Sequence, residues 1–250
     1  MFSLNPSLQS YSWGSKTLIA DLRGEESPTQ HPQAELWYGA HPAAPADIAG
    51  VPLTDIIAAD PDRELGAAVR ARFGDRLPFL LKLLAVAEPL SLQAHPSLAQ
   101  AQEGFRRENA QGIDVRAGNR NYRDDNHKPE LIVALTPFHA MAGFRPLAAT
   151  LELFAALDCP SLARYVGMID STGEEAVNLR MLFTTWITIP AAVRKQLIDD
   201  IIVAAKRVVA EGSAAEWQRE TLANIIELDT HYPGDVGVLG ALLLNYVRLE

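Results

Sequence analysis

The stretch AAVRKQLIDDIIVAAKRVVAE, residues 191–211, is the clearest helix in the sequence and decides how the rest of the chain is divided. Its apolar residues recur at helical spacing, with charged residues between them. They are Leu197, Ile198, Ile201, Ile202, Ala205, Val208 and Val209. Gly212 is a stop signal, and Ser213 is the predicted N-cap of a further helix over residues 214–228.

Two more helices are predicted before this stretch, over residues 147–157 and 174–189, so residues 147–232 form a helical block. The chain on either side of it is typical of strands and turns. Apolar runs bounded by Pro, Gly or Asn predict strands at 34–38, 77–87, 90–94, 131–135, 236–238 and 242–249. Short helices are predicted only around 53–59 and 99–108. We therefore expect a mainly β protein with an α insertion: a β domain over 1–146, the insertion over 147–232, and return strands over 233–250.

Composition excludes several classes of protein. The chain has 250 residues, 48% of them hydrophobic and 21% charged, which is an ordinary globular balance. A net charge of −9 argues against general nucleic-acid binding. The single cysteine, Cys159, permits no internal disulfide. The first 16 residues lack a signal-peptide pattern, and the apolar run at 181–193 is too short to cross a bilayer. We expect a cytoplasmic protein without a membrane or nucleic-acid partner.

The segment SLQAHP at 91–96 offers a possible metal site. Proline favours an extended conformation for the residue before it, here His95. On a strand, Ser91, Gln93 and His95 share a face, and alternate residues are close enough for an amide oxygen and an imidazole to meet at one metal. The alternative is an edge strand with a polar outer face.

A second polar group lies in NHKPELIV at 126–133. By the same parity Lys128 and Glu130 face together, and His127 faces away. Glu130 leads into an apolar run that we expect to be buried, where a carboxylate is costly unless it is paired or bound to metal. The alternative is a local ion pair between Lys128 and Glu130.

A lysine and a group of aromatic residues complete the candidates. Lys82 interrupts the apolar run LPFLLKLL at 77–84, either projecting into a polar lumen or extending to solvent from an amphipathic helix. Glu35 lies in AELWYGAHP at 34–42, and Trp13 lies in YSWG at 11–14. These residues could line a sugar pocket or belong to the core.

Taken together, these segments resemble the type I mannose-6-phosphate isomerases (phosphomannose isomerases). The matching stretches occur in family order over the first 146 residues. They are YSWG at 11–14, AELWYGAHPAAP at 34–45, LPFLLKLLAVAEPLSLQAHP at 77–96, GFRRENAQGI at 104–113 and NYRDDNHKPELIVALTPFHAMAGFRP at 121–146.

The resemblance implies a zinc-dependent aldose–ketose isomerase that interconverts mannose 6-phosphate and fructose 6-phosphate and supplies GDP-mannose metabolism. It implies a cupin-type (jelly-roll-like) β-barrel with an inserted helical domain. One Zn²⁺ per chain and a monomer are expected. The residues implied are Gln93, His95 and Glu130 as zinc ligands, Lys82 and Lys128 as catalytic residues, and Trp13, Glu35 and Ser91 in the substrate pocket.

The sequence departs from the family pattern at its end. In the family a fourth zinc ligand, a histidine in a His-Ala-Tyr-like segment, lies beyond the position of Glu250, followed by an active-site arginine and a second cupin domain. We therefore expect a fragment or a shortened homologue. The alternative function is that of a catalytically silent sugar-phosphate-binding protein. An iron-dependent cupin ranks last, because the three predicted ligands include only one histidine.

Overall fold

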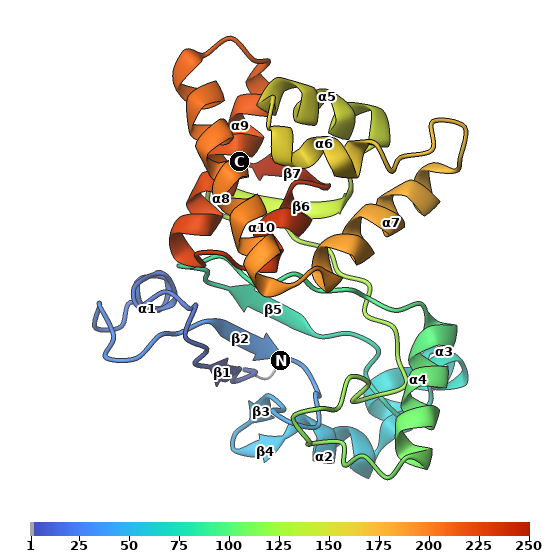
Figure 1. Cartoon of the computed structure of the whole chain (residues 1–250). Coiled ribbons are helices and arrows are strands. Elements are labelled where there is room, and N and C mark those ends of the chain that lie inside the picture. The colour runs from blue at the N-terminus through green and yellow to red at the C-terminus, as the bar shows by residue number, and fades with distance from the viewer. Residues whose placement is uncertain (1–2) are drawn as a thin grey trace. The chain divides into compact units, whose positions relative to one another are not determined.

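The computed structural model describes residues 3–250 of the chain (Figure 1). Met1 and Phe2, which begin the segment inspected for a signal peptide, lie outside the described residues. The chain divides into two compact units, Met1–Leu90 and Ser91–Glu250.

The first unit is built on a three-stranded antiparallel sheet in the order β1-β2-β5, formed by Ser7–Gln9, Glu35–Tyr38 and Leu81–Leu84. The strand predicted at 34–38 is confirmed as β2, and that predicted at 77–87 is confirmed only over the four residues of β5. Ile19, Leu36 and Ala85 form its buried cluster. The remaining elements are α1 (Leu18–Arg23), the β3–β4 hairpin (Asp47–Ile48 and Val51–Pro52), α2 (Leu53–Ala59) and α3 (Pro61–Phe73).

A close backbone approach explains the glycine of the YSWG segment. A Cβ atom on Gly14 would lie 2.6 Å from the Cα atom of Ala34, which is closer than real Cβ atoms come to backbone. Gly14 also forms an isolated bridge with Val86, and Ala85 N donates to Ala34 O. Three separate sequence segments therefore meet at this small residue.

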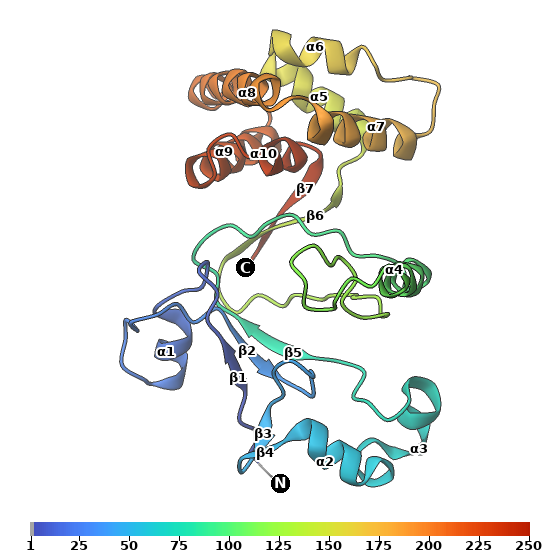
Figure 2. The ribbon, with the colours of Figure 1, turned by 60° about the horizontal axis from the view of Figure 1, so that its bottom comes forward.

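The second unit contains most of the helices. Figure 2 shows α8 and α9 alongside each other, with α10 next to α9. The helices are α4 (Leu98–Ala110), α5 (Leu147–Leu157), α6 (Pro160–Val166), α7 (Glu175–Thr188), α8 (Ala191–Glu211), α9 (Glu216–His231) and α10 (Val236–Ala241). Trp186 of α7, 1% exposed, lies in the core between them.

The predicted helix over 191–211 is confirmed at both ends. Its apolar stripe is largely buried, and Gly212 ends it in the left-handed conformation with φ 69°. The predicted N-cap Ser213 is wrong by two residues: α9 has Ala215 at its N-cap, where the side chain of Gln218 accepts a hydrogen bond from the Ala215 amide. No single helix within residues 3–250 is long and apolar enough to cross a membrane. α7 and α8 pass that test only as a pair, which is bent by 116°.

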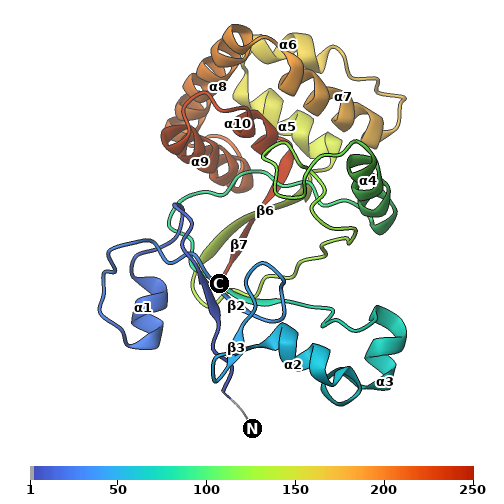
Figure 3. The same ribbon diagram turned by 90° about the horizontal axis from the view of Figure 1, so that it is seen from below.

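The second unit also contains a two-stranded ladder, in which β6 (Phe138–Phe144) pairs antiparallel with β7 (Leu244–Leu249) (Figure 3). The ladder joins the chain before the helical block to the chain after it, and the predicted strand at 242–249 is confirmed. The buried guanidinium of Arg145 donates to the carbonyl oxygens of Leu242 and Leu244 at 2.9 and 2.6 Å and so ties the two ends together.

Other strand predictions are wrong. Residues 236–238 lie in α10, because the Asp235 side chain accepts a hydrogen bond from the Gly237 amide and caps a helix there. Residues 90–94 and 131–135 belong to no strand, and Leu131 is 90% exposed. A strand needs a hydrogen-bonded neighbour, and apolar composition alone does not supply one. Helices therefore hold more of the described residues than strands do, and the expectation of a mainly β chain holds only in part.

Candidate active site

Two of the predicted metal ligands approach each other in the second unit. The Nε2 atom of His95 lies 3.9 Å from the Oε2 atom of Glu130. His95 also lines a pocket of about 320 Å³, together with Pro96, Ser97, Leu98, His127, Lys128 and Pro129. Two segments that are 35 residues apart in sequence thus bring an imidazole, a carboxylate and an ammonium group to one region of this unit.

The chain direction after His95 is fixed by a helix cap. Ser97 is the N-cap of α4; its hydroxyl accepts from the Gln100 amide, and the Gln100 side chain accepts from the Ser97 amide. Such a capping box satisfies two amide groups that a helix start leaves free. The segment before it, residues 91–96, belongs to no strand, so the strand parity used to group Ser91, Gln93 and His95 does not apply.

The donor set of this pair fits a divalent metal. Two ligands of a tetrahedral zinc ion, each about 2.1 Å from it, are roughly 3.4 Å apart. The separation of 3.9 Å between His95 and Glu130 is therefore half an ångström from that value. Gln93 and Ser91 are exposed in the same segment as His95. Within residues 3–250 no group of three or more His, Cys, Asp and Glu side chains could hold a metal, so a third ligand must be of another kind, such as an amide or water.

Lys128 has a different partner from the one considered in the sequence. Its Nζ atom lies 3.2 Å from Oδ2 of Asp124, so the local pair with Glu130 is not formed. Asp124 also accepts a hydrogen bond from the Asn126 amide. The carboxylate of Glu130 is thereby left facing His95, and its side chain is 58% exposed. The expectation that Glu130 enters a buried run is wrong, because the run that follows it is exposed.

His127 is the pocket residue that the parity argument missed. Strand parity predicts that His127 points away from Lys128, yet both side chains line the same pocket. No strand forms here, so neighbouring residues are not forced to opposite sides. Asp124 was also missed, although its spacing of four residues from Lys128 could have suggested an ion pair.

The first unit has its own polar cluster on one face of the β1-β2-β5 sheet. In β2, Glu35 and Trp37 point to the same side, and Lys82 of β5 is the register partner of Trp37. One carboxylate oxygen of Glu35 accepts the Trp37 indole N–H at 2.6 Å and lies 3.5 Å from the Lys82 Nζ atom. Lys82 also lies 4.8 Å from the centre of the Trp37 ring. Lys82 is thus on a strand, and the amphipathic-helix alternative is wrong.

The buried Glu35 carboxylate influences a nearby tyrosine. Tyr11 stacks on Trp13, with 5.6 Å between ring centres. Burial of the phenol, and then the negative charge of Glu35, raise the pKa of Tyr11 above its ordinary value. Trp37 was missed as a member of this cluster, although its position two residues after Glu35 on a strand gives the signal.

Glu35→Gln is expected to lower the pKa of Tyr11, because the neutral amide no longer repels the phenolate. Burial remains, so the pKa is expected to stay above its ordinary value. Tyrosine ¹³Cζ chemical shifts followed through an alkaline titration give the measurement. The matched control is Glu25→Gln, which removes an exposed carboxylate paired with Arg23 in the same unit. An unchanged Tyr11 pKa in Glu35→Gln would contradict this electrostatic coupling.

Comparison with known proteins places these groups in a family. Residues 1–147 match the family described as phosphomannose isomerase type I, catalytic domain. The chain belongs to this family. A type I phosphomannose isomerase domain thus supplies the His95, Lys128 and Glu130 segments described above.

Individual relatives cover the whole chain but are longer than it. The mannose-6-phosphate isomerase of Escherichia coli strain K12 is 40% identical over 257 residues, covering 100% of this chain and 62% of the relative. The human mannose-6-phosphate isomerase is 30% identical, with 61% of its length covered. A crystal structure of the Salmonella typhimurium mannose 6-phosphate isomerase, bound to the substrate F6P and a zinc atom, has a TM-score of 0.83 at 37% identity, over 100% of this chain and 61% of that one. The chain therefore spans less than two thirds of these relatives.

Proposed function

We propose that this chain binds one zinc ion through Gln93, His95 and Glu130 and acts as an aldose–ketose isomerase on mannose 6-phosphate and fructose 6-phosphate. The observation that carries the proposal is the 3.9 Å approach of His95 and Glu130 beside a pocket that Lys128 lines. A zinc-bound relative of similar fold supports the choice of metal, and the substrate in that structure supports the choice of sugar phosphate.

The reaction moves one proton from C2 to C1 of the open-chain sugar and one from O2 to O1. Negative charge develops on oxygen as the C2 proton leaves. Bound zinc would supply a Lewis acid that polarises the sugar carbonyl. The ammonium group of Lys128 would stabilise charge on the sugar oxygens or bind the phosphate dianion, since charge-assisted contacts are the stronger hydrogen bonds.

Lys128 is available for this role despite its ion pair. Both Lys128 and Asp124 are partly exposed, with 57% and 43% of their side-chain surface accessible. An exposed pair of this kind contributes only about 0–1 kcal/mol. A doubly charged phosphate therefore competes with Asp124 at little cost, and the pair holds the lysine near the pocket until substrate arrives.

The proposal includes the first-unit residues by their family motifs. Lys82 is proposed as a second catalytic lysine, oriented by its contacts with Glu35 and Trp37. Trp13 and Glu35 are proposed to line the sugar-phosphate pocket, as is Ser91 of the second unit. We also propose a cupin-type barrel domain over 1–146 and 233–250 with the helical insertion over 147–232, and a cytoplasmic, monomeric protein.

A coupled assay tests the function. The chain is incubated with zinc and mannose 6-phosphate, and fructose 6-phosphate is detected through downstream enzymes. Zinc-dependent formation of fructose 6-phosphate is the expected result. Stabilisation by the sugar phosphate without turnover would replace the isomerase proposal by that of a silent binding protein.

A further inference from the structure

In the second unit, α4 and the segment that follows it form two arms joined at one end. α4 begins three residues after His95 and is 13 residues long, or about 20 Å. The chain then returns through residues 111–127 to the pocket that His95 and Lys128 share. His95 and Glu130 therefore lie at the open ends of the two arms, and their separation depends on how the returning arm is held against the helix.

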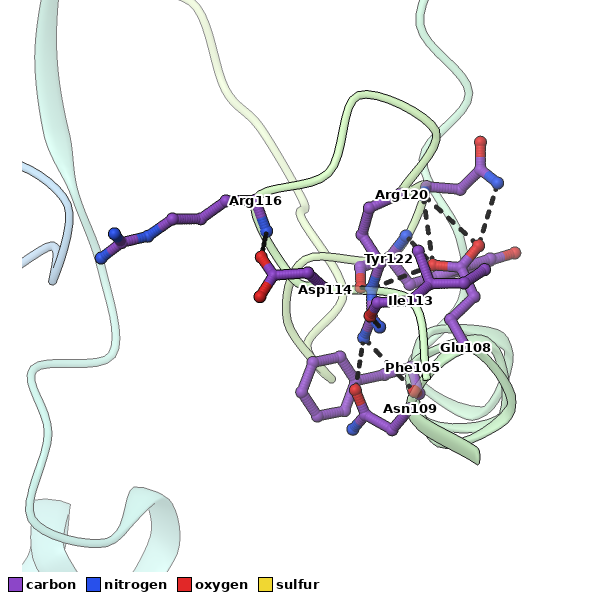
Figure 4. A network of polar contacts seen from close by, with 9 residues as sticks. Phe105, Glu108, Asn109, Ile113, Asp114, Arg116, Arg120 and Tyr122 are labelled. Carbon is purple, nitrogen blue, oxygen red and sulfur yellow. Dashed lines mark hydrogen bonds and ion pairs between the residues drawn. The ribbon is translucent and has the colours of Figure 1, made fainter. Parts of the chain in front are cut away.

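A buried ion pair holds the returning arm at the far end of α4 (Figure 4). The carboxylate of Glu108, in the last turn of the helix, accepts from the backbone amides of Asn121 and Tyr122 and from the Asn121 side chain. The Arg120 Nε atom lies 3.1 Å from the same carboxylate. The two side chains are 4% and 0% exposed. The hydrogen bond from the Tyr122 amide is the main cause of a lowered pKa of Glu108, so this carboxyl group stays ionised.

Arg120 contacts both ends of the loop as well as the helix. Its guanidinium donates to the carbonyl oxygens of Ile113 and Tyr122 at 2.7 and 2.6 Å and to the Asn109 side chain at 2.7 Å. A buried ion pair adds little net stability compared with apolar packing, but removing one partner leaves an uncompensated charge. This pair is therefore suited to selecting one loop conformation.

An aromatic contact along the helix adds to this clamp. A Cβ atom on Gly104 would overlap the ring of Tyr122, so the ring lies directly against the α4 backbone. The guanidinium of Arg107 lies 5.9 Å from the centre of the same ring. The GFRRENAQGI segment at 104–113, which no catalytic role accounts for, is explained by these contacts.

We infer that Glu108 and Arg120 are positioning residues that hold the arm of residues 120–130 against α4 and so set the distance between Glu130 and His95. Only seven residues lie between Tyr122 and Glu130, and the contacts of Asp124 with Asn126 and Lys128 stiffen that stretch. The consequence for zinc affinity rests on the proposed function, whereas the position of the arm does not.

The first measurement is zinc affinity in Glu108→Gln and Arg120→Met, compared with the unmodified sequence by competition with a chelating dye. About a tenfold loss is expected in both, at the lower end of the range for residues that support metal ligands. The matched control is Arg145→Met, which removes another buried arginine of the same unit, bonded to the carbonyls of Leu242 and Leu244. Its zinc affinity is expected to stay within twofold. Circular dichroism checks that each variant is folded.

The second measurement needs no metal. One spin label is placed on α4 through Gln102→Cys and the other directly after the returning arm through Leu131→Cys, with buried Cys159 replaced by serine. One narrow distribution of the distance between the two labels is expected, and Glu108→Gln is expected to broaden that distribution. Gly104→Ala, which displaces Tyr122, is expected to do the same.

The two measurements separate the inference from the proposed function. Broadening together with weaker zinc binding supports the inference. Broadening in a protein that binds no zinc even without the clamp mutations supports the inference and refutes the proposed metal site. In a zinc-binding protein, an unchanged distribution or an unchanged affinity overturns the positioning role while the metal site stands.

Discussion

Replacing His95 with alanine is expected to abolish stoichiometric zinc, from one ion per chain to less than a tenth. Zinc sites with four protein ligands in small peptides have binding free energies of about 10–16 kcal/mol, so one ligand accounts for roughly 2.5–4 kcal/mol. That corresponds to a loss of affinity of about a hundredfold or more. Elemental analysis after dialysis gives the stoichiometry, and dye competition gives the affinity.

His139→Ala is the matched control for this variant. His139 is also an exposed histidine of the second unit, but it lies on β6, where its Nδ1 atom is 3.0 Å from the Tyr246 hydroxyl. It is expected to retain one zinc ion. Zinc content that is unchanged in His95→Ala, or lost equally in both variants, would remove His95 from the ligand set.

Lys128→Met is expected to reduce kcat/KM for mannose 6-phosphate by about 10²–10³-fold while zinc stays bound. Removing one charged or hydrogen-bonding group that stabilises an oxyanion has an effect of this size. The methionine keeps most of the length of the side chain and removes its charge. Coupled-assay kinetics and elemental analysis on the same preparation give the two readouts.

Lys195→Met is the control for the loss of an exposed ion pair. Lys195 pairs with Asp199 at 2.7 Å on α8, with the same four-residue spacing as Asp124 and Lys128. It is expected to leave kcat/KM unchanged. Kinetics of Lys128→Met that match those of Lys195→Met would exclude Lys128 from substrate binding and from the reaction.

The helical half of the fold could be predicted because its signals are local. In α8 all the predicted apolar residues except Val209 become buried, and Gly212 ends the helix where its φ angle is positive. The predicted helix at 53–59 coincides with α2, and that at 99–108 lies within α4. Neither prediction required knowledge of a distant partner.

The strands depended on partners that sequence does not specify. β2 and β5 pair with each other, and both were predicted. The runs at 90–94 and 131–135 have similar composition but no pairing neighbour among the described residues, and Val133 and Leu135 are each 75% exposed. Composition predicts which segments can form strands. Whether a segment does form one depends on a neighbouring segment with which it can exchange backbone hydrogen bonds.

In the candidate site, too, the sequence indicates the residues involved but not the contacts that bring them together. The family resemblance, and not strand parity, implied that His95 and Glu130 bind one zinc ion, and in the structure they lie 3.9 Å apart. What brings them together is the α4 hairpin, held by Glu108 and Arg120 across twelve residues of sequence. No local pattern reveals such a contact, because it depends on the path of the loop.

X-ray absorption at the zinc edge tests whether His95 and Glu130 share one metal ion. The expected spectrum has a first shell of nitrogen and oxygen at about 2.0–2.2 Å, with the outer-shell scattering of a single imidazole that disappears in His95→Ala. A spectrum with no imidazole contribution, or one that His95→Ala leaves unchanged, would contradict a shared ion.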